Sequence, residues 1–214
     1  LGHQSKRCRG LFDHNIKSKS ASVFCLIITD ICFRRGGLCM GLRRDNICSY
    51  CNEGEIAMIQ IGDRVPDVEF YRMSSSGPEA ITSGGWFHEK RVVLFALPGA
   101  FTPTCSARHL PGYLERSEEI RSKGVDSIAC LSVNDAFVMD AWGKASNAEE
   151  IIMLADGNGF FTKQIGLDMS TGNFGGLRSL RYSMLVEDGE VKKLNVEDPG
   201  RFDVSDAQTM LDSL

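Results

Sequence analysis

The run Val-Val-Leu-Phe-Ala-Leu at residues 92–97 is the feature that most restricts the fold of this chain. Every residue in it is apolar, and no polar side chain occupies alternate positions, which is typical of a strand buried on both faces. Two further apolar stretches of strand length follow, at residues 127–133 and 151–155. A sheet that is covered on both sides needs helices above and below it, so these runs predict a layered α/β fold.

The remaining elements are predicted from apolar periodicity and from the residues that end helices or turn the chain. They are helices at 104–121 with a kink or break at Pro111-Gly112, at 136–144 and at 206–214, and strands at 180–186 and 191–196. The two last strands are joined through Asp188-Gly189, a dipeptide typical of hairpin turns. Together these elements predict a mixed central sheet flanked by helices.

The first part of the chain differs from the rest in charge and in cysteine content. Residues 1–44 hold nine Lys and Arg against two Asp and Glu, whereas the whole chain has a net charge of −4. Six of the eight cysteines precede Met58. We expect residues 1–57 to be a leader outside the mature domain and residues 58–214 to form that domain. A cytoplasmic location is expected, or an organellar one if residues 1–57 are a transit segment.

Composition also limits the partners of the protein. The net negative charge argues against nucleic acid as the main partner. The apolar run at residues 21–33 is interrupted by Asp30 and is too short to span a bilayer, so no membrane partner is expected. Cys48 and Cys51 have the C-x-x-C spacing of zinc sites and redox pairs, but no second pair follows at zinc-finger distance. We therefore predict no metal site.

Cys105 lies where a helix is expected to begin, directly after the buried strand. Pro103 suits the first helical turn, and Thr102 before it is a residue type preferred as an N-cap. Free backbone N–H groups and the helix dipole at such a position stabilise a thiolate, which is the nucleophilic form of cysteine. A small buried apolar cysteine, which is what free cysteines usually are, is the other interpretation that the local residues leave open.

The stretch PGAFTPTCS at residues 98–106, followed by HLPGY at residues 109–113, resembles the active-site signature of peroxiredoxins. The likeness is strongest to type II members, the peroxiredoxin-five subfamily, and it continues through residues 131–145, 154–167 and 178–197. It covers about residues 58–214. The resemblance implies a thioredoxin-like fold and thiol-dependent reduction of hydrogen peroxide and organic hydroperoxides.

The resemblance also assigns roles to individual residues. Cys105 falls on the peroxidatic cysteine, which attacks the peroxide and becomes a sulfenic acid. Thr102 falls on the threonine whose hydroxyl contacts the peroxide, and Pro98 on the proline that shields the thiolate from water. Arg181 falls on the arginine that completes the pocket, with Arg178 as the fallback candidate. A guanidinium at that place would favour the thiolate and bind peroxide oxygens.

Four further residues are secondary candidates. Thr104 and His109 are expected near the pocket, although His109 can equally be read as plain helix surface. Trp142 and Phe174 are candidates for the pocket wall or for a dimer contact, and simple packing is the alternative for both.

The sequence offers one cysteine besides Cys105 in residues 58–214 for the recycling step. That residue, Cys130, sits in the apolar run IACLSV, which favours a buried strand cysteine over a resolving one. We therefore expect an external thiol, glutathione with glutaredoxin, and no bound cofactor. The alternatives are recycling by thioredoxin through Cys130 and a non-enzymatic redox sensor that acts through Cys105.

Two other hypotheses are weighed against the peroxidase. A disulfide reductase of the thioredoxin type is disfavoured because no second cysteine follows Cys105 within residues 106–109. A zinc-binding module in the leader is the other hypothesis. The resemblance implies a homodimer.

Overall fold

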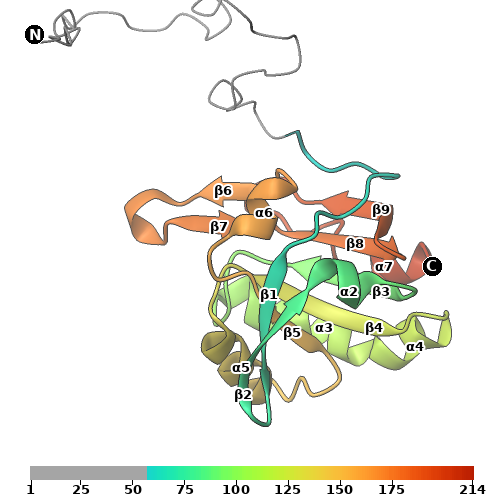
Figure 1. The fold of residues 1–214 in the computed structure, drawn as a ribbon, viewed down its shortest axis with the longest axis horizontal. Coiled ribbons are helices and arrows are strands. Elements are labelled where there is room, and N and C mark those ends of the chain that lie inside the picture. Colours follow the sequence, from blue (N-terminus) through green and yellow to red (C-terminus); the bar gives the residue numbers. More distant parts are fainter. Residues whose placement is uncertain (1–56) are drawn as a thin grey trace, which may run out of the picture. The chain divides into compact units, whose positions relative to one another are not determined.

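The computed structural model describes residues 57–214 (Figure 1). Its strands are β1 (Glu69–Ser74), β2 (Gly77–Thr82), β3 (Arg91–Ala96), β4 (Ser127–Ser132), β5 (Ile152–Ala155), β6 (Asp168–Ser170), β7 (Leu177–Ser179), β8 (Tyr182–Glu187) and β9 (Glu190–Val196). Its helices are α2 (Ser83–Phe87), α3 (Leu110–Glu115), α4 (Ser117–Ser122), α5 (Ala136–Ala145), α6 (Phe160–Gln164) and α7 (Ala207–Asp212), with a π-helical turn at Cys105–His109 and a 3₁₀ turn at Gly172–Phe174. The predictions for the leader, including the Cys48 and Cys51 pair, lie outside the described residues.

Seven of the strands form one mixed sheet in the order β2-β1-β5-β4-β3-β8-β9. β3, β4 and β5 run parallel to one another, whereas β8 is antiparallel to β3 and β9 is antiparallel to β8. The helices between the parallel strands provide the crossover connections that such strands need. The predicted α/β architecture, a mixed central sheet flanked by helices, is confirmed. In Figure 1 the β6 and β7 hairpin extends to the left of this sheet.

The interior strand β3, between β4 and β8, is buried on both faces, as its sequence predicted. All of residues 92–97 are 0% exposed. Val93 and Phe95 pack in a cluster with α3, α4, α5 and α7, and Val92 and Leu94 pack in a second cluster with α2 and α6. Adjacent residues of a strand point to opposite faces, so an unbroken apolar run supplies both cores.

The helix that follows β3 differs from its prediction. The predicted break at Pro111-Gly112 is wrong, because α3 runs through both residues and the chain breaks instead at Arg116 (φ −110°, ψ 9°). Pro111 falls in the first turn of α3, directly after the π-helical turn. A proline is accommodated there because the regular i→i−4 ladder is already interrupted by the π-helical turn, in which the Leu110 amide bonds to the Cys105 carbonyl.

Two hairpins and two short helices were not predicted. They are β1 with β2, β6 with β7, α2 and α6. α6 has only five residues, and its N-terminus is held by the buried Asp156, whose carboxylate accepts hydrogen bonds from the amides of Phe161 (3.2 Å) and Thr162 (2.9 Å). Gly159 before it has φ +68°, and a Cβ there would lie 2.2 Å from Leu177. Elements this short carry too little periodicity to be predicted from sequence.

The turn and the cap near the C-terminal end follow the sequence signals. Asp188 and Gly189 both have positive φ, 46° and 78°, as a tight turn between β8 and β9 requires. Asp206 caps α7 through its carboxylate, which accepts hydrogen bonds from the amides of Gln208 and Thr209. The predicted turn and the predicted C-terminal helix are confirmed, whereas the cap at Asp206 is a finding of the structure.

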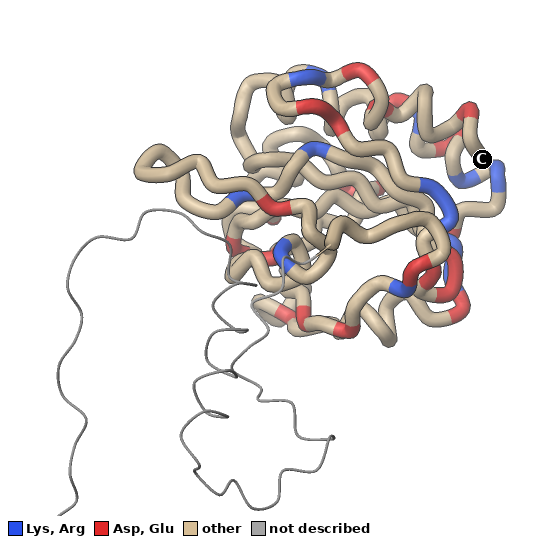
Figure 2. The backbone as a smooth tube through the Cα atoms, turned by 90° about the horizontal axis from the view of Figure 1, so that it is seen from above, with Lys and Arg blue, Asp and Glu red and all other residues tan. Residues whose placement is uncertain are grey.

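None of the helices formed by residues 57–214 has the length and the apolar character needed to cross a membrane. Acidic and basic positions are interspersed along the described backbone in Figure 2 rather than gathered by sign.

Candidate active site

The loop at residues 98–102 leaves the C-terminal end of β3 and is fixed by the neighbouring strand. Asn134, just beyond the end of β4, accepts hydrogen bonds from the Ala100 amide (3.0 Å) and from the Ser132 hydroxyl (2.8 Å) through its side-chain oxygen. The carboxyl ends of parallel strands share one edge of the sheet, so a polar residue after β4 can reach a loop after β3. Sequence analysis missed Asn134, although its place after a buried strand was the available signal.

Within this loop, Phe101 and Thr102 directly precede the helix and set the direction in which it starts. Phe101 has φ 60°, which costs a non-glycine residue about 1–2 kcal/mol, and its ring is 58% exposed. The Thr102 carbonyl oxygen accepts a helical hydrogen bond from the Ser106 amide (3.0 Å), so Thr102 holds the N-cap position of the backbone. Its hydroxyl does not cap the helix as predicted, because it donates to the Gly99 carbonyl (2.9 Å) and closes the turn.

Cys105 occupies the first turn of this helix, and its side chain is fully buried. Arg181 donates from Nη2 to the Cys105 Sγ atom at 3.4 Å. The sheet places this arginine, because Tyr182 pairs with Ala96 at the end of β3 and Arg181 directly precedes Tyr182. The sulfur therefore lies beside a fixed positive charge, away from water.

Three of the predicted site residues line one cavity, whereas Cys105 and Thr102 are not among the residues that line it. Pro98, Thr104 and Arg181 line a cavity of about 220 Å³, with Met169 and Leu180 among the other lining residues. The fallback candidate Arg178 does not take this place. It donates to the carbonyl oxygens of Gly175 (2.8 Å) and Val133 (3.4 Å) and so ties two loops together.

His109 is buried, so its interpretation as helix surface is wrong. Its Nδ1 atom lies 3.0 Å from Arg181 Nη1, and its Nε2 atom lies 3.2 Å from the Ser205 carbonyl oxygen. Burial, and then the charge of Arg181, lower the pKa of His109 from 6.5 to about 3. The imidazole is therefore neutral near pH 7. A neutral ring donates from Nε2 to the carbonyl and accepts at Nδ1 from the arginine.

Glu197, which sequence analysis missed, holds the segment that carries Ser205. One carboxylate oxygen accepts from the amides of Asp203, Val204 and Ser205, each at 2.8 Å, and from the Ser205 hydroxyl at 2.9 Å. Burial alone would raise the pKa of Glu197, but these hydrogen bonds outweigh it and lower that pKa. A glutamate after a strand is not distinguishable by sequence from an ordinary surface charge.

Cys130 lies in β4, opposite Phe95 of β3, and is 0% exposed. It belongs to the same buried cluster as Cys105. Burial raises the pKa of the Cys130 thiol well above its ordinary value, and the nearby Cys105 raises it further. Cys130 is thus a buried, protonated strand thiol.

The two aromatic candidates have different surroundings. Trp142 is buried, and its indole N–H donates to the Ser106 hydroxyl at 3.0 Å, one residue from Cys105. Phe174 is 97% exposed, so it does not form a pocket wall within this chain. Its predicted role in a dimer contact stays a prediction.

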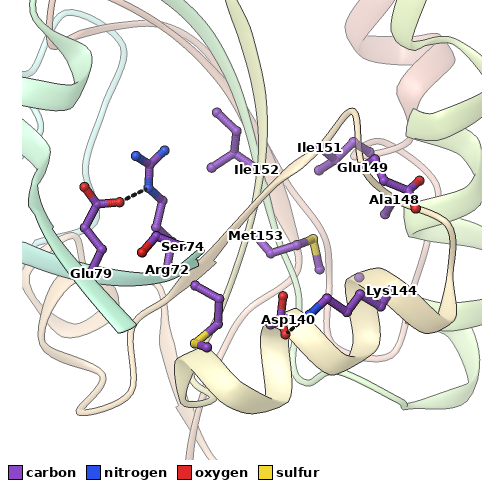
Figure 3. A pocket seen from close by; sticks show the side chains of 12 residues that line it. Arg72, Ser74, Glu79, Asp140, Lys144, Ala148, Glu149, Ile151, Ile152 and Met153 are labelled. Atoms are coloured by element: carbon purple, nitrogen blue, oxygen red, sulfur yellow. Dashed lines mark hydrogen bonds and ion pairs between the residues drawn. The ribbon is translucent and has the colours of Figure 1, made fainter. Parts of the chain in front are cut away.

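A larger cavity lies away from Cys105. It measures about 370 Å³ and is lined by residues of β1, β2, α5 and β5, including the ion pairs Arg72–Glu79 (2.9 Å) and Lys144–Asp140 (2.8 Å) (Figure 3). None of the predicted site residues lines it. Among residues 57–214, no group of three or more His, Cys, Asp or Glu side chains is placed to hold a metal ion.

Comparison with known proteins assigns the described fold to one family. Residues 60–211 match the family model Redoxin. The chain is 45% identical over 172 residues to peroxiredoxin-2E, chloroplastic, of Arabidopsis thaliana, a match covering 78% of this chain and 74% of that protein. It is 48% identical over 159 residues to a peroxiredoxin of Synechocystis, covering 70% of this chain and 80% of the other. The crystal structure of reduced Prx3 from Vibrio vulnificus in complex with H2O2 has a TM-score of 0.72 and 52% identity, covering 73% of this chain and 99% of the other.

The pKa of His109 predicts a pH dependence of stability. Between the folded-state value of about 3 and the unfolded value of 6.5, the unfolded chain binds a proton that the folded chain excludes. The stability present above pH 6.5 should therefore fall as the pH is lowered toward 3, by up to roughly 1.4 kcal/mol per pH unit. The measurement is the free energy of unfolding between pH 7 and pH 4 for the wild type and for His109→Asn. The wild type should lose more stability over this range, and parallel curves would contradict the assignment.

Proposed function

Because the chain belongs to the redoxin family and is a peroxiredoxin, a thiol peroxidase, we propose that Cys105 is its peroxidatic cysteine and that an external thiol recycles it. The observation that carries this proposal is the contact of the Arg181 guanidinium with the buried Cys105 sulfur at 3.4 Å. A cation beside a sulfur at the start of a helix favours the thiolate, which is the reactive form.

In the proposed reaction, the Cys105 thiolate attacks the terminal oxygen of a hydroperoxide. A sulfur–oxygen bond forms, the O–O bond breaks, and its electron pair leaves with the second oxygen. That oxygen takes up a proton and departs as water or an alcohol, and Cys105 is left as a sulfenic acid. The sulfur is oxidised by two electrons, and the peroxide is reduced by two.

The neighbours of Cys105 support this reaction by hydrogen bonding and by excluding water. Arg181 offers guanidinium N–H donors to the sulfur and to the peroxide oxygens, where charge develops as the O–O bond breaks. Thr102 donates its own proton to Gly99, so its oxygen lone pairs are available to accept from the peroxide O–H. Pro98 and Thr104 line the cavity beside Arg181, and the absence of an N–H in proline suits a wall that shields the thiolate.

We propose glutathione with glutaredoxin as the reductant, with no bound cofactor. The thiol would attack the sulfenic acid and release water, and a second thiol would resolve the mixed disulfide. The complete burial and the raised pKa of Cys130 support an external thiol over this one. Recycling by thioredoxin through Cys130 is the second candidate, and the presence of Cys130 and Cys105 in one buried cluster favours it.

The substrates that we propose are hydrogen peroxide and organic hydroperoxides. Met169 and Leu180 supply apolar surface to the cavity, which suits an alkyl chain beside the peroxide group. We also propose a homodimer, supported by the exposed rings of Phe101 (58%) and Phe137 (63%). The Arabidopsis relative is named chloroplastic, which supports an organellar location over the cytoplasmic one.

The cysteine assignments predict different results for two variants. Cys105→Ser should abolish peroxide consumption, because a hydroxyl is not ionised near neutral pH. Cys130→Ala should keep most of the activity with glutathione and glutaredoxin. The assay is peroxide consumption under steady-state conditions. An equal loss in both variants would contradict recycling by an external thiol.

The arginine assignment is tested by Arg181→Ala, with Arg178→Ala as the matched control. Losing a charged hydrogen bond to the thiolate should slow the reaction with hydrogen peroxide by about tenfold to a hundredfold or more. The pH–rate profile should also move to higher pH. Arg178 contacts only carbonyl oxygens of two loops, so its variant should keep the wild-type profile. An unchanged pH–rate profile in Arg181→Ala would contradict the proposal that Arg181 favours the Cys105 thiolate.

The reductant is tested by comparing turnover with glutathione and glutaredoxin against turnover with thioredoxin. We expect faster turnover with the first pair in the wild type and in Cys130→Ala. Thioredoxin-driven turnover that is faster and is lost in Cys130→Ala would establish the second candidate instead.

A further inference from the structure

A continuous chain of hydrogen bonds leads from the segment at residues 203–205 to the sulfur of Cys105. The Ser205 carbonyl accepts from His109 Nε2 (3.2 Å), and His109 Nδ1 accepts from Arg181 Nη1 (3.0 Å). The other terminal nitrogen of Arg181 donates to Cys105 Sγ (3.4 Å). One planar guanidinium therefore has one nitrogen on an imidazole and the other on the sulfur.

The imidazole determines where the second nitrogen points. A guanidinium is rigid and planar, so fixing one terminal nitrogen leaves only rotation about that contact for the other. An arginine side chain alone has several rotatable bonds and loses much rotamer entropy when it is held in one position. The ring of Phe202 limits the remaining freedom, because it lies 5.0 Å from the His109 ring and 5.5 Å from the Arg181 guanidinium carbon.

The carbonyl of Ser205 determines which nitrogen of His109 carries the proton. A carbonyl oxygen can only accept, so Nε2 must donate and Nδ1 must be the acceptor. Tyr113 donates to the same carbonyl at 3.0 Å. Glu197 holds this carbonyl in place, because its carboxylate binds the amides of the three residues 203–205.

We propose that His109 is a positioning residue for the peroxidase reaction: its Nδ1 lone pair holds Arg181 so that the other guanidinium nitrogen faces Cys105. Glu197 supports the same arrangement by fixing the carbonyl that sets the His109 tautomer. This inference rests on the proposed roles of Cys105 and Arg181. It adds a residue that touches neither the sulfur nor the peroxide and acts through the arginine.

Two amide substitutions separate the two hydrogen bonds of His109, the one accepted from Arg181 and the one donated to Ser205. In His109→Asn the amide oxygen sits at the same branch of the side chain as Nδ1, so it can still accept from Arg181. In His109→Gln the amide reaches the Nε2 position and can still donate to Ser205, but the acceptor for Arg181 is lost. His109→Leu removes both hydrogen bonds while the site remains filled by an apolar side chain.

The measurement is the second-order rate constant for oxidation of the reduced enzyme by hydrogen peroxide in a single turnover, which does not depend on the reductant. Without the acceptor for Arg181, His109→Leu and His109→Gln should react about tenfold to a hundredfold more slowly than the wild type, the range for a lost hydrogen bond to a charged group. His109→Asn should stay within about threefold of it, and near-ultraviolet circular dichroism checks folding. If His109→Leu does not fold, the comparison of His109→Gln with His109→Asn decides, and equal rates for these two would overturn the proposal.

A double-mutant cycle separates positioning from general structural damage. If His109 acts through Arg181, then His109→Gln should cause no further slowing in the Arg181→Ala background. Slowing by the same factor in both backgrounds would overturn the proposal.

The proposed role of Arg181 and the proposed role of His109 are contradicted by different results. If Arg181→Ala reacted at the wild-type rate, the proposed role of the arginine would fail whatever the His109 variants did. If Arg181→Ala were slow and His109→Gln were folded and fast, only the positioning role would fail. Glu197→Gln, which keeps an amide oxygen for the three backbone N–H groups, should slow the reaction less than His109→Gln does. If Glu197→Gln slowed the reaction more than His109→Gln does, the proposal that Glu197 acts through His109 would be contradicted.

Discussion

Burial of β3 on both faces is the constraint on which the rest of the described structure depends. Its side chains pack in two separate apolar clusters, one on each face, so helices must cover both sides of the sheet. β3 ends at the edge of the sheet where its parallel neighbour β4 also ends and its antiparallel neighbour β8 begins. The loop at residues 98–102 starts at this edge. Asn134 after β4 and Arg181 before β8 are brought to this loop by the pairing of those strands with β3. The position of the Cys105 sulfur is thus set by the packing of the sheet.

The proposed thiolate has a cost at that position, because a charge is poorly solvated where a side chain is 0% exposed, as that of Cys105 is. The protein compensates with the Arg181 guanidinium and with the start of a helix, both of which favour negative charge. The guanidinium must itself be kept from the like charge of a protonated imidazole. The burial of His109 achieves this, because its lowered pKa leaves the ring neutral. The same low-dielectric surroundings keep the Cys130 thiol protonated.

The sequence predicted those elements correctly whose residue pattern is typical of a single local structure. The apolar run of β3, the Asp188-Gly189 turn and the C-terminal helix each have a local cause and were predicted correctly. Interactions between distant segments left no such signal. His109 was taken as surface or pocket lining, because its partners Arg181 and Ser205 lie 72 and 96 residues away. Glu197 was not noticed, because the amides that it binds belong to a loop 6 to 8 residues further on. The helix break was misplaced because a π-helical turn before Pro111 cannot be recognised from the residues that form it.

The separation of these residues along the chain has a consequence for synthesis. A polypeptide is synthesised from its N-terminus to its C-terminus, so Cys105 is added well before Arg181, Glu197 and Ser205. Until those segments are added and the sheet closes, Cys105 lacks the guanidinium contact on which its proposed role depends. Under that proposal, the nascent chain does not yet hold the arrangement that reacts with peroxide. The arrangement is complete only when the fold is complete.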